Sequence, residues 1–327
     1  MTIKDIAKMA GVSVAAVSRY FNGGSLSDEK REIIQKIVEE NNYVPNAMAQ
    51  TMRTGKSGNI GVIVPRLDSE SFAQIMAGIA DEVEKINYTV ILGVTDNKKE
   101  KEIYYIEQME KSKMDGIILM GTYMTPHLKT TLEKCSIPIV VTGQHFKGVP
   151  SVFYDDKSAM YDITKLMLKS RKHIAFIGAP SIDRAAGKMR KEGVEKALEE
   201  AGIDKKSLIA YESDFTIDGG YETMKKILKS HKKVDGVICA TDRMAHGAML
   251  AIREAGKNIP DDISITGVGD SWGDKISSPQ LTTVQLYYKK CGQTAVNLLW
   301  GLMKGESDSH LISKVMLGYS IIERGSV

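Results

Sequence analysis

The chain has no long apolar segment and few cysteines. None of its apolar runs approaches the roughly 18 residues that a membrane-spanning helix requires. The first residues include Asp5 and lack the apolar stretch of a secretory signal, so we expect no signal peptide. The 3 cysteines, Cys135, Cys239 and Cys291, lie far apart, which fits neither a disulfide framework nor a zinc site. These absences predict a cytoplasmic protein with no membrane partner.

Motifs for catalysis or metal binding are also missing. The 6 histidines are scattered, and neither HExxH nor CxxC nor GxSxG occurs. Residues 54–57 (TGKS) resemble part of a phosphate-binding loop, but Gln50 stands where the first glycine of that loop is required. Gly267 and Gly269 lack the third glycine of a dinucleotide fingerprint, because Trp272 takes its place. We therefore predict that the chain is not an enzyme and binds neither a metal nor a cofactor.

The length and the charge distribution indicate more than one domain. A chain of 327 residues, 43% hydrophobic and 26% charged, is typical of two or three folded units. The net charge of +3 is too small to identify a partner by itself. Residues 1–58 hold eight basic and six acidic residues, so this segment alone carries +2. The basic excess is concentrated at the N-terminus.

The first 40 residues have the pattern of three short helices. Thr2 is placed to cap a helix over 3–10, and Gly11 ends it. Ser13 is placed to cap a second helix over 14–21. A third helix begins after Ser27, and we expect Ile33, Ile34, Ile37 and Val38 to face inward. Two short helices joined by a tight turn and braced by a third are typical of a helix-turn-helix; the alternative is a three-helix module that binds protein.

A helix-turn-helix presents the start of its second helix to the major groove of DNA. That rule places Val14, Ala15, Ser18 and Arg19 near the bases. Residues 42–53 read as a fourth helix, too short and too weakly amphipathic to be stable without a partner surface. The glycines and small polar residues of 54–58 indicate a linker.

From residue 59 onward, short apolar runs alternate with amphipathic segments. We predict strands at 59–64, 88–94, 116–120, 137–142, 151–153, 173–178, 236–240 and 263–267. Helices are predicted at 71–86, 100–112, 156–169, 189–201 and 242–255. This alternation predicts an α/β body of two doubly wound parallel-sheet subdomains. Ligands of such sheets bind at the carboxyl ends of the strands, here after 64, 120, 142, 178, 240 and 268, where arginine, aspartate and aromatic residues suited to a sugar are frequent.

The N-terminal motifs TIKDIAKMAGVS, VSRYFN and NYVPNAMAQ resemble the DNA-binding head and hinge helix of the lactose/galactose-repressor family of bacterial transcription regulators. The resemblance implies that Val14 and Ala15 read operator bases, and that Met52 takes the place of a leucine wedged into the minor groove. Val14 and Ala15 offer no hydrogen bonds, so they can read only thymine methyl groups or DNA shape. The DNA-binding residues implied are Thr2, Ser13, Val14, Ala15, Ser18, Arg19, Asn22, Asn46, Ala49 and Met52.

The resemblance continues through the body. The motifs YDD at 154–156, ATDRMAHGAM at 240–249, ISITGVGD at 263–270 and LTTVQ at 281–285 are similar to the family's effector-binding region, which is periplasmic-binding-protein-like. This similarity implies that Arg190 grips the effector, that Phe215 covers it and that Trp272 lies on the floor of the pocket. The effector-binding residues implied are Arg66, Asp68, Ser69, Phe72, Gln144, Arg184, Lys188, Arg190, Phe215, Asp242, Asp270, Trp272 and Gln285.

A narrower likeness, carried by IVPRLDSES and GAPSIDRAAGKMRKE, is to the trehalose-operon branch of that family. It implies that Arg66 binds the phosphate of trehalose 6-phosphate, with Arg184, Lys188 and Arg190 adding positive charge. Sucrose 6-phosphate or a free sugar remains an alternative effector, and Arg66 could instead pair with Asp68 or a dimer partner. A sugar-binding protein or enzyme with a helical head is a weaker alternative.

The resemblance implies a homodimeric repressor of a carbohydrate-utilisation operon, with operator double-stranded DNA and the effector as partners. We expect a head at 1–44, a hinge helix and linker at 45–58, and a body at 59–327. Within the body, subdomain N is expected at about 59–157 and 287–318, and subdomain C at about 158–286 and 319–327. Effector binding is expected to change the angle between the subdomains and move the hinge helices, with release of DNA as the expected direction.

Overall fold

The computed structural model describes the chain except for residues 22, 44–54, 231–232 and 307–312. It consists of two compact units, the head at Met1–Gly58 and the body at Asn59–Val327. Among the described residues, none of the helices has the length and apolar character needed to cross a membrane.

The head contains three helices, α1 (Ile3–Met9), α2 (Val14–Phe21) and α3 (Asp28–Glu40), in the order predicted. Its core consists of Ile6, Ala7, Ala10, Val17 and Ile34. The prediction for Ile33 was wrong, since its side chain is 40% exposed and Ile34 takes the inward position. Consecutive side chains of a helix point about 100° apart, and Ile34 lies closer to the centre of the buried face of α3 than Ile33 does.

The ends of the first two head helices are stabilised as the sequence predicts. The Thr2 hydroxyl accepts a hydrogen bond from the Asp5 backbone N–H at 3.4 Å, and the Thr2 backbone N–H donates to the Asp5 carboxylate at 2.8 Å. This reciprocal pair is a capping box, which fixes where the helix begins. The Ser13 hydroxyl accepts from the Ala16 N–H at 3.2 Å at the start of α2. The Thr2 cap therefore fixes the start of α1, and the Ser13 cap fixes the end of the turn between the two helices.

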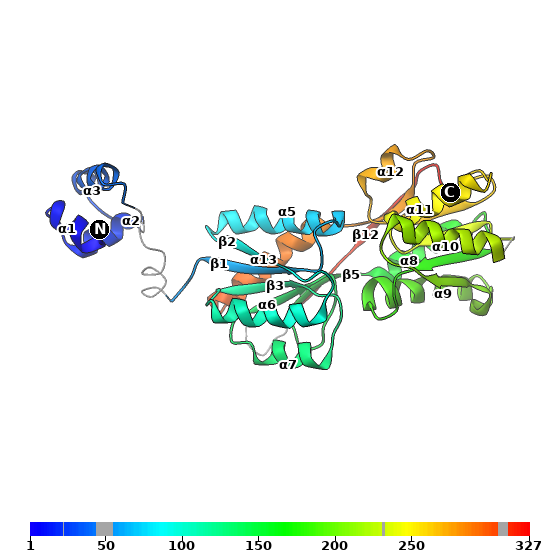
Figure 1. The fold of residues 1–327 in the computed structure, drawn as a ribbon, viewed down its shortest axis with the longest axis horizontal. Coiled ribbons are helices and arrows are strands. Elements are labelled where there is room, and N and C mark those ends of the chain that lie inside the picture. Colours follow the sequence, from blue (N-terminus) through cyan, green and yellow to red (C-terminus); the bar gives the residue numbers. More distant parts are fainter. Residues whose placement is uncertain (22, 44–54, 231–232, 307–312) are drawn as a thin grey trace. The chain divides into compact units, whose positions relative to one another are not determined.

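The body contains two six-stranded sheets with helices on both faces (Figure 1). The first sheet has the order β11-β5-β4-β3-β1-β2 and the second β12-β10-β9-β8-β6-β7. The strands of the first sheet are β1 (Asn59–Val64), β2 (Thr89–Val94), β3 (Gly116–Met120), β4 (Ile139–Thr142), β5 (Ser151–Tyr154) and β11 (Lys314–Leu317). Those of the second are β6 (Ile174–Gly178), β7 (Ile209–Glu212), β8 (Gly236–Cys239), β9 (Ser264–Val268), β10 (Thr282–Leu286) and β12 (Tyr319–Ile322). We refer to the part of the body built on each sheet as the first and the second subdomain.

Helices α5 and α13 cover one face of the first sheet, and α6 and α7 the other (Figure 1). In the second subdomain α10 packs on α11 and α8 on α9, on opposite faces of the sheet (Figure 1). The helices of the body are α5 (Glu70–Lys85), α6 (Lys99–Lys111), α7 (Pro126–Lys134), α8 (Asp156–Met167), α9 (Arg190–Glu200), α10 (Ile217–Ser230), α11 (Asp242–Glu254), α12 (Trp272–Ile276) and α13 (Tyr288–Lys304). A π-helical segment, Arg184–Met189, leads directly into α9.

All strand pairs of the first sheet are parallel, for instance β1 with β2 and with β3. Each predicted strand lies within two residues of an observed one. The doubly wound prediction is confirmed, with one difference, because β12 runs antiparallel to β10. The chain leaves β11 and enters β12 after a single residue, so it reaches the second sheet at the edge where that sheet's parallel strands end. It must therefore run against them.

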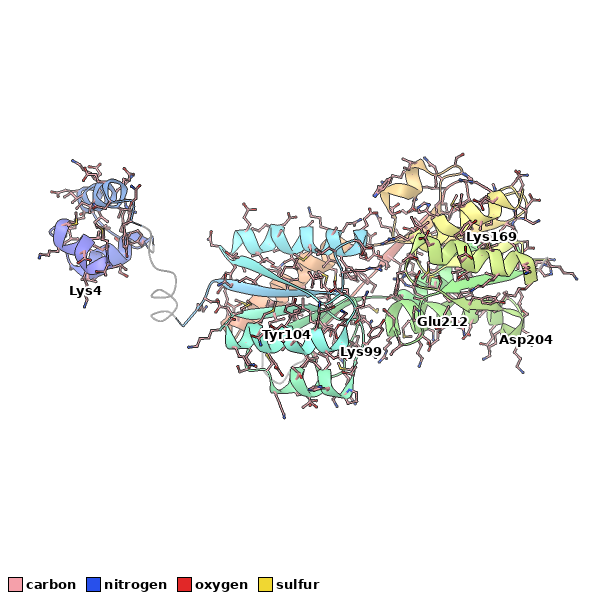
Figure 2. All side chains as sticks on the ribbon, viewed as in Figure 1. Lys4, Lys99, Tyr104, Lys169, Asp204 and Glu212 are labelled. Carbon is pink, nitrogen blue, oxygen red and sulfur yellow. The ribbon has the colours of Figure 1, made fainter. Side chains whose placement is uncertain are left out.

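Charged side chains lie mainly at the surface. Figure 2 shows Lys4, Lys169 and Asp204 projecting from the ribbon, and all three are exposed. Strands in the middle of the sheets are buried on both faces: β1, β3 and β6 consist almost entirely of inaccessible apolar residues. Polar side chains that could bind a ligand inside the body are therefore expected where the strands end.

Candidate functional site

The exposed part of α2 is the candidate surface for DNA in the head. Val14 is 46% exposed, and Ser13, Ala15 and Arg19 are also exposed, while Ala16 and Val17 are buried beneath them. The helix therefore presents its first turn and Arg19 outward, as a recognition helix must. Ser18 is half-buried on the same helix. Asn22, Asn46, Ala49, Met52 and the predicted hinge helix lie outside the described residues.

A cavity of about 640 Å³ lies where the strands of the two sheets end. Pro65, Met120 and Thr142 reach it from the first sheet, and Thr241 and Val268 from the second. Its volume falls within the range of ordinary small-molecule sites. Of the predicted effector residues, those that line this cavity are Arg66, Asp68, Ser69, Phe72, Gln144, Arg190, Phe215, Asp242 and Trp272. We call it the central cavity.

Arg190 is the most deeply placed cation of the central cavity. It is 6% exposed, and its Nε donates to the Asp156 carboxylate at 2.7 Å, while its guanidinium also donates to the carbonyl of Ala240. Burial acts to lower the pKa of Arg190, but Asp156 and neighbouring groups raise it above its ordinary value. Tyr288 lies beside this pair, and burial raises the pKa of its phenol. These contacts hold the guanidinium of Arg190 in one orientation at the wall of the cavity, where it can donate hydrogen bonds to a ligand.

A second group of charges contains residues from both subdomains. The Asp68 carboxylate lies 3.5 Å from Arg66 Nε and 3.1 Å from an Arg243 nitrogen. Asp68 and Arg66 belong to the first subdomain, and Arg243 to the first turn of α11 in the second. The Arg66 guanidinium also lies over the Phe215 ring, 5.5 Å from its centroid. Two guanidinium groups therefore face one carboxylate at the wall of the cavity.

Two further hydrogen bonds join the subdomains. The Gln144 side chain donates to the Asp183 carboxylate at 3.2 Å, and the Trp272 backbone N–H donates to the Glu70 carboxylate at 3.3 Å. Burial raises the pKa of Asp183. Residues that line the central cavity thus also form contacts between the two subdomains.

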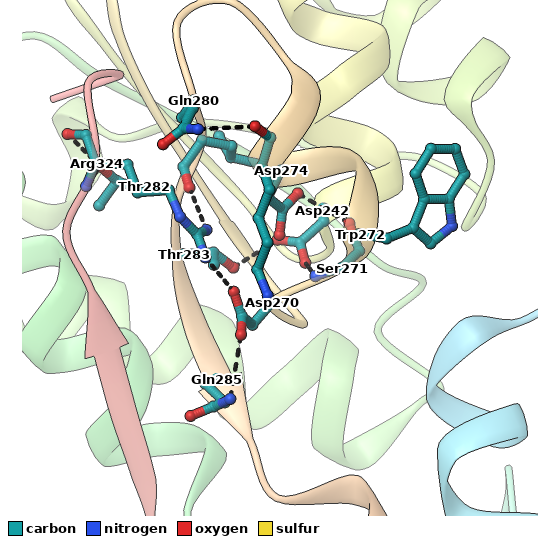
Figure 3. A network of polar contacts seen from close by, with 12 residues as sticks. Asp242, Asp270, Ser271, Trp272, Asp274, Gln280, Thr282, Thr283, Gln285 and Arg324 are labelled. Atoms are coloured by element: carbon teal, nitrogen blue, oxygen red, sulfur yellow. Dashed lines mark hydrogen bonds and ion pairs between the residues drawn. The ribbon is translucent and has the colours of Figure 1, made fainter.

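Asp242 is buried at the cavity wall and organises the loop that follows β9 (Figure 3). Its carboxylate accepts from the Thr283 hydroxyl at 2.6 Å and from the Ser271 backbone N–H at 3.1 Å. Burial raises the pKa of Asp242 well above its usual range, and the neighbouring carboxyl of Asp274 acts in the same direction. These contacts give Asp242 a positioning role for residues 269–272, which a reading of its motif alone does not indicate.

The structure places Asp270 and Gln285 away from the central cavity. The Asp270 carboxylate forms an ion pair with Arg324 and accepts from the Gln285 amide at 3.1 Å (Figure 3). Asp270 therefore joins the loop after β9 to Arg324 near the C-terminus and to Gln285 on β10. Trp272 does not form the floor of the cavity, because its side chain is 67% exposed and points away from this network (Figure 3). It lies at the mouth.

Arg184 and Lys188 also fall outside the lining of the central cavity. They lie four residues apart on the π-helical segment, and both are exposed. Ala186 and Arg190, also four apart, occupy the opposite face and line the cavity. Arg184 instead lines a smaller neighbouring cavity. The predicted cluster of four cations around one phosphate is thus not formed, because only Arg66 and Arg190 of the four line the central cavity.

Sequence reasoning missed several residues of the cavity. Those not named as effector residues include Glu70, Tyr154, Asp156, Arg243, His246 and Tyr288, while Tyr123 and Asp183 fall in the segments after residues 120 and 178, where ligand binding was predicted. Arg243 directly follows the predicted Asp242 at the start of a helix, and this position could have identified it from the sequence as a residue of the cavity. His246 also lines the cavity and lies 2.9 Å from the buried Asp274 carboxylate. Within the described residues no group of histidine, cysteine, aspartate and glutamate side chains is suited to hold a metal.

A helix-turn-helix head joined to a two-subdomain α/β body is the architecture of a DNA-binding regulator. Comparison with known proteins identifies the particular family. Residues 2–46 match the family of bacterial regulatory proteins called the lacI family, and residues 164–327 match a periplasmic binding protein-like domain. The chain belongs to the LacI family of transcription regulators.

Relatives match over nearly the whole length. The HTH-type transcriptional regulator RegA of Clostridium saccharobutylicum is 32% identical, covering 99% of this chain and 98% of the relative. The sucrose operon repressor of Staphylococcus xylosus is 30% identical, covering 91% and 92%. The Lac repressor dimer bound to operator and the anti-inducer ONPF has a similar structure, with a TM-score of 0.89 at 25% identity, covering 100% of this chain and 98% of that chain. The relatives are transcription regulators and not enzymes, so this chain is a DNA-binding transcriptional regulator.

Proposed function

We propose that this protein is a homodimeric repressor of a carbohydrate-utilisation operon, and that a sugar or sugar phosphate in the central cavity controls its affinity for operator DNA. The similarity to the sucrose operon repressor and to the operator-bound Lac repressor dimer supports the assignment. Pairing of two heads suits the two half-sites of an operator, because one recognition helix buries too little DNA for useful affinity.

The lining of the central cavity favours a polyhydroxylated ligand. Thr142 is buried at its wall, and its hydroxyl has no hydrogen-bond partner among the described residues. A buried polar group without a partner is costly, so a hydroxyl of a bound ligand would stabilise the site. Arg190, Asp183 and Gln144 add donors and acceptors, and Phe215 offers an aromatic face for C–H groups of a sugar ring.

The observation that carries the phosphate part of the proposal is the Arg66–Asp68–Arg243 group. The Asp68 side chain is 62% exposed, and exposed ion pairs contribute only about 0–1 kcal/mol. A phosphate monoester carries more charge than a carboxylate and accepts bidentate hydrogen bonds from guanidinium groups, so it can replace Asp68 between the two arginines. Trehalose 6-phosphate is our first candidate, and sucrose 6-phosphate or a free sugar are the alternatives.

A ligand of this kind would act by changing the arrangement of the subdomains. The contacts that now join them, Arg243 with Asp68 and Gln144 with Asp183, are made by residues that line the cavity. The ligand shifts the equilibrium only if it binds one arrangement more tightly, typically by about 1–3 kcal/mol. Because residues 44–58 connect the body to the head, the change must reach DNA through them. We expect effector binding to release the operator.

The direct test is a binding panel. Thermal unfolding of the full-length protein is followed with trehalose 6-phosphate, sucrose 6-phosphate, trehalose and sucrose, and each compound that raises the Tm is then tested in an operator mobility-shift assay with operator selected from random DNA. The proposal expects a phosphorylated disaccharide to raise the Tm and to change operator affinity. No response to any sugar or sugar phosphate in either assay would contradict it.

Replacing Arg66 with alanine tests the phosphate contact. Loss of a charge-assisted hydrogen bond should weaken the sugar phosphate by roughly tenfold to a hundredfold, and should leave the affinity for the free sugar within about twofold of wild type. Isothermal titration of both ligands measures the difference. Lys98→Ala removes an equal charge from an exposed position that does not line the cavity and serves as the control. Equal losses for the two ligands would remove Arg66 from phosphate recognition.

A further inference from the structure

A second cavity of about 200 Å³ lies beside the central cavity and has a different character. The first subdomain contributes Met124 and Lys129 near α7 and the loop 144–147 after β4, while the second contributes Ile182 and Arg184. Gln144 lines both cavities. In the first sheet β4 and β1 are separated by β3, so this cavity is two strands away from the end of β1, which leads to Arg66. We call it the basic cavity.

The charges around the basic cavity have one sign. Its described lining contains Lys129, Lys147 and Arg184 but neither aspartate nor glutamate. The central cavity, in contrast, has both arginines and carboxylates in its walls. Lys129 Nζ lies 3.7 Å from the Glu133 carboxylate, and both side chains are more than half exposed, so this ion pair contributes little. Neither Lys147 nor Arg184 forms an ion pair with any residue that the structure describes.

His145 adds a polar group with unused capacity. Its ring packs against Phe153, with centroids 5.2 Å apart, and its Nε2 atom is buried without a hydrogen-bond partner among the described residues. Burial lowers the pKa of His145, and the charges of Lys314 and Arg184 lower it further. The positive charge of Lys314 on β11 therefore also acts on this region. Cations gathered around one cavity are stabilised when an anion is bound between them.

We propose that the basic cavity is a second ligand site, separate from the central cavity, which binds a small phosphate-type dianion between Lys129 and Lys147 of the first subdomain and Arg184 of the second. Arg184 offers the planar donors that match phosphate oxygens, and the lysines supply charge. Because the cations belong to both subdomains, such an anion stabilises the arrangement of the subdomains seen here. The cations of this site are different from Arg66 and Arg243, the residues proposed to bind the phosphate of the effector.

The test uses the full-length protein and inorganic phosphate as the probe. The Tm is measured against phosphate concentration at constant ionic strength, with chloride as the balancing anion, and the dissociation constant is obtained from the rise in Tm. Arg184→Ala and Lys147→Ala are each expected to raise this constant by about tenfold. Both side chains are exposed, so the variants should fold, and their Tm without phosphate verifies this.

Two controls separate this site from its surroundings. Lys188→Ala removes the same charge from the same π-helical segment but from outside both cavities, and it should leave the phosphate constant within about twofold of wild type. Arg66→Ala reports on any phosphate bound in the central cavity, so a rise in Tm that Arg184→Ala removes and Arg66→Ala retains belongs to the basic cavity. If Arg66→Ala removes the effect and Arg184→Ala does not, phosphate binds the central cavity and the proposal fails. A wild-type Tm that does not respond to phosphate overturns it as well.

Discussion

Replacing Arg190 with alanine is expected to lower the free energy of unfolding by about 3–5 kcal/mol and to abolish effector binding. Removing the guanidinium leaves the Asp156 carboxylate buried without its ion-pair partner, and an uncompensated buried charge is the most costly outcome of breaking such a pair. The carbonyl of Ala240 loses a donor in the same substitution. For a protein whose total stability is on the order of 5–15 kcal/mol, this is a large fraction.

Urea unfolding followed by circular dichroism measures the loss of stability. Lys191→Ala is the matched control, because Lys191 is the next residue, is exposed, and forms only an i,i+4 pair with Glu195 at 3.8 Å; its effect should stay within about 0.5 kcal/mol. If Arg190→Ala unfolded at the same urea concentration as Lys191→Ala, the buried pair would not contribute to stability as argued.

A double variant separates the structural role of Arg190 from its role in binding. Combining Arg190→Met with Asp156→Leu removes both charges and fills much of the same volume, so most of the lost stability should return. Recovery should be incomplete, since Asp156 lies in the first turn of α8, where a negative charge is worth about 0.3–1 kcal/mol. Effector binding should not return. A double variant that bound the sugar phosphate normally would show that Arg190 acts only on stability.

The head could be predicted nearly completely because its signals are local. The Thr2–Asp5 capping box, the Ser13 cap and the apolar spacing of Ile6, Ala7 and Ala10 lie within a few residues of one another. Interactions of this kind depend on the backbone conformation of a single turn, which the sequence determines directly. The buried strands of the body could be predicted equally well from the sequence, because buried parallel strands are continuous apolar runs.

The cavity could be predicted only in part, because its side chains are positioned by contacts between distant segments. Asp270 looked available after β9, but the Arg324 that engages it comes from near the end of the chain, 54 residues later. Strand ends specify which loops surround a cavity; they do not specify which side chain of each loop turns inward. Arg184 and Arg190 illustrate the same limit on one helical segment, since rotation about its axis sends one to the basic cavity and the other to the central cavity.

Replacing Arg19 with alanine is expected to lower operator affinity by roughly a hundredfold or more, since each lost contact to a base or phosphate costs about 1–3 kcal/mol and a dimer loses two. Arg19 is exposed on α2, the helix whose first turn is presented outward. The helix itself should persist, because the core residues Val17 and Ile34 remain in place. Effector binding should also be unchanged, since the cavity belongs to the body alone.

The affinity of Arg19→Ala is measured on operator selected from random DNA by the wild-type protein, over a range of salt concentrations. Lys36→Ala removes the same charge from an exposed position on α3 and should leave operator affinity within about twofold of wild type, because α3 braces the head and does not present the recognition surface.

If Arg19 contacts phosphate, the slope of log affinity against log salt should fall in magnitude by about 2 for the dimer. If it contacts a base, the slope should hold while the preference for the selected operator over random DNA declines. Either result places α2 against DNA, and an affinity equal to that of wild type would remove this helix from operator recognition.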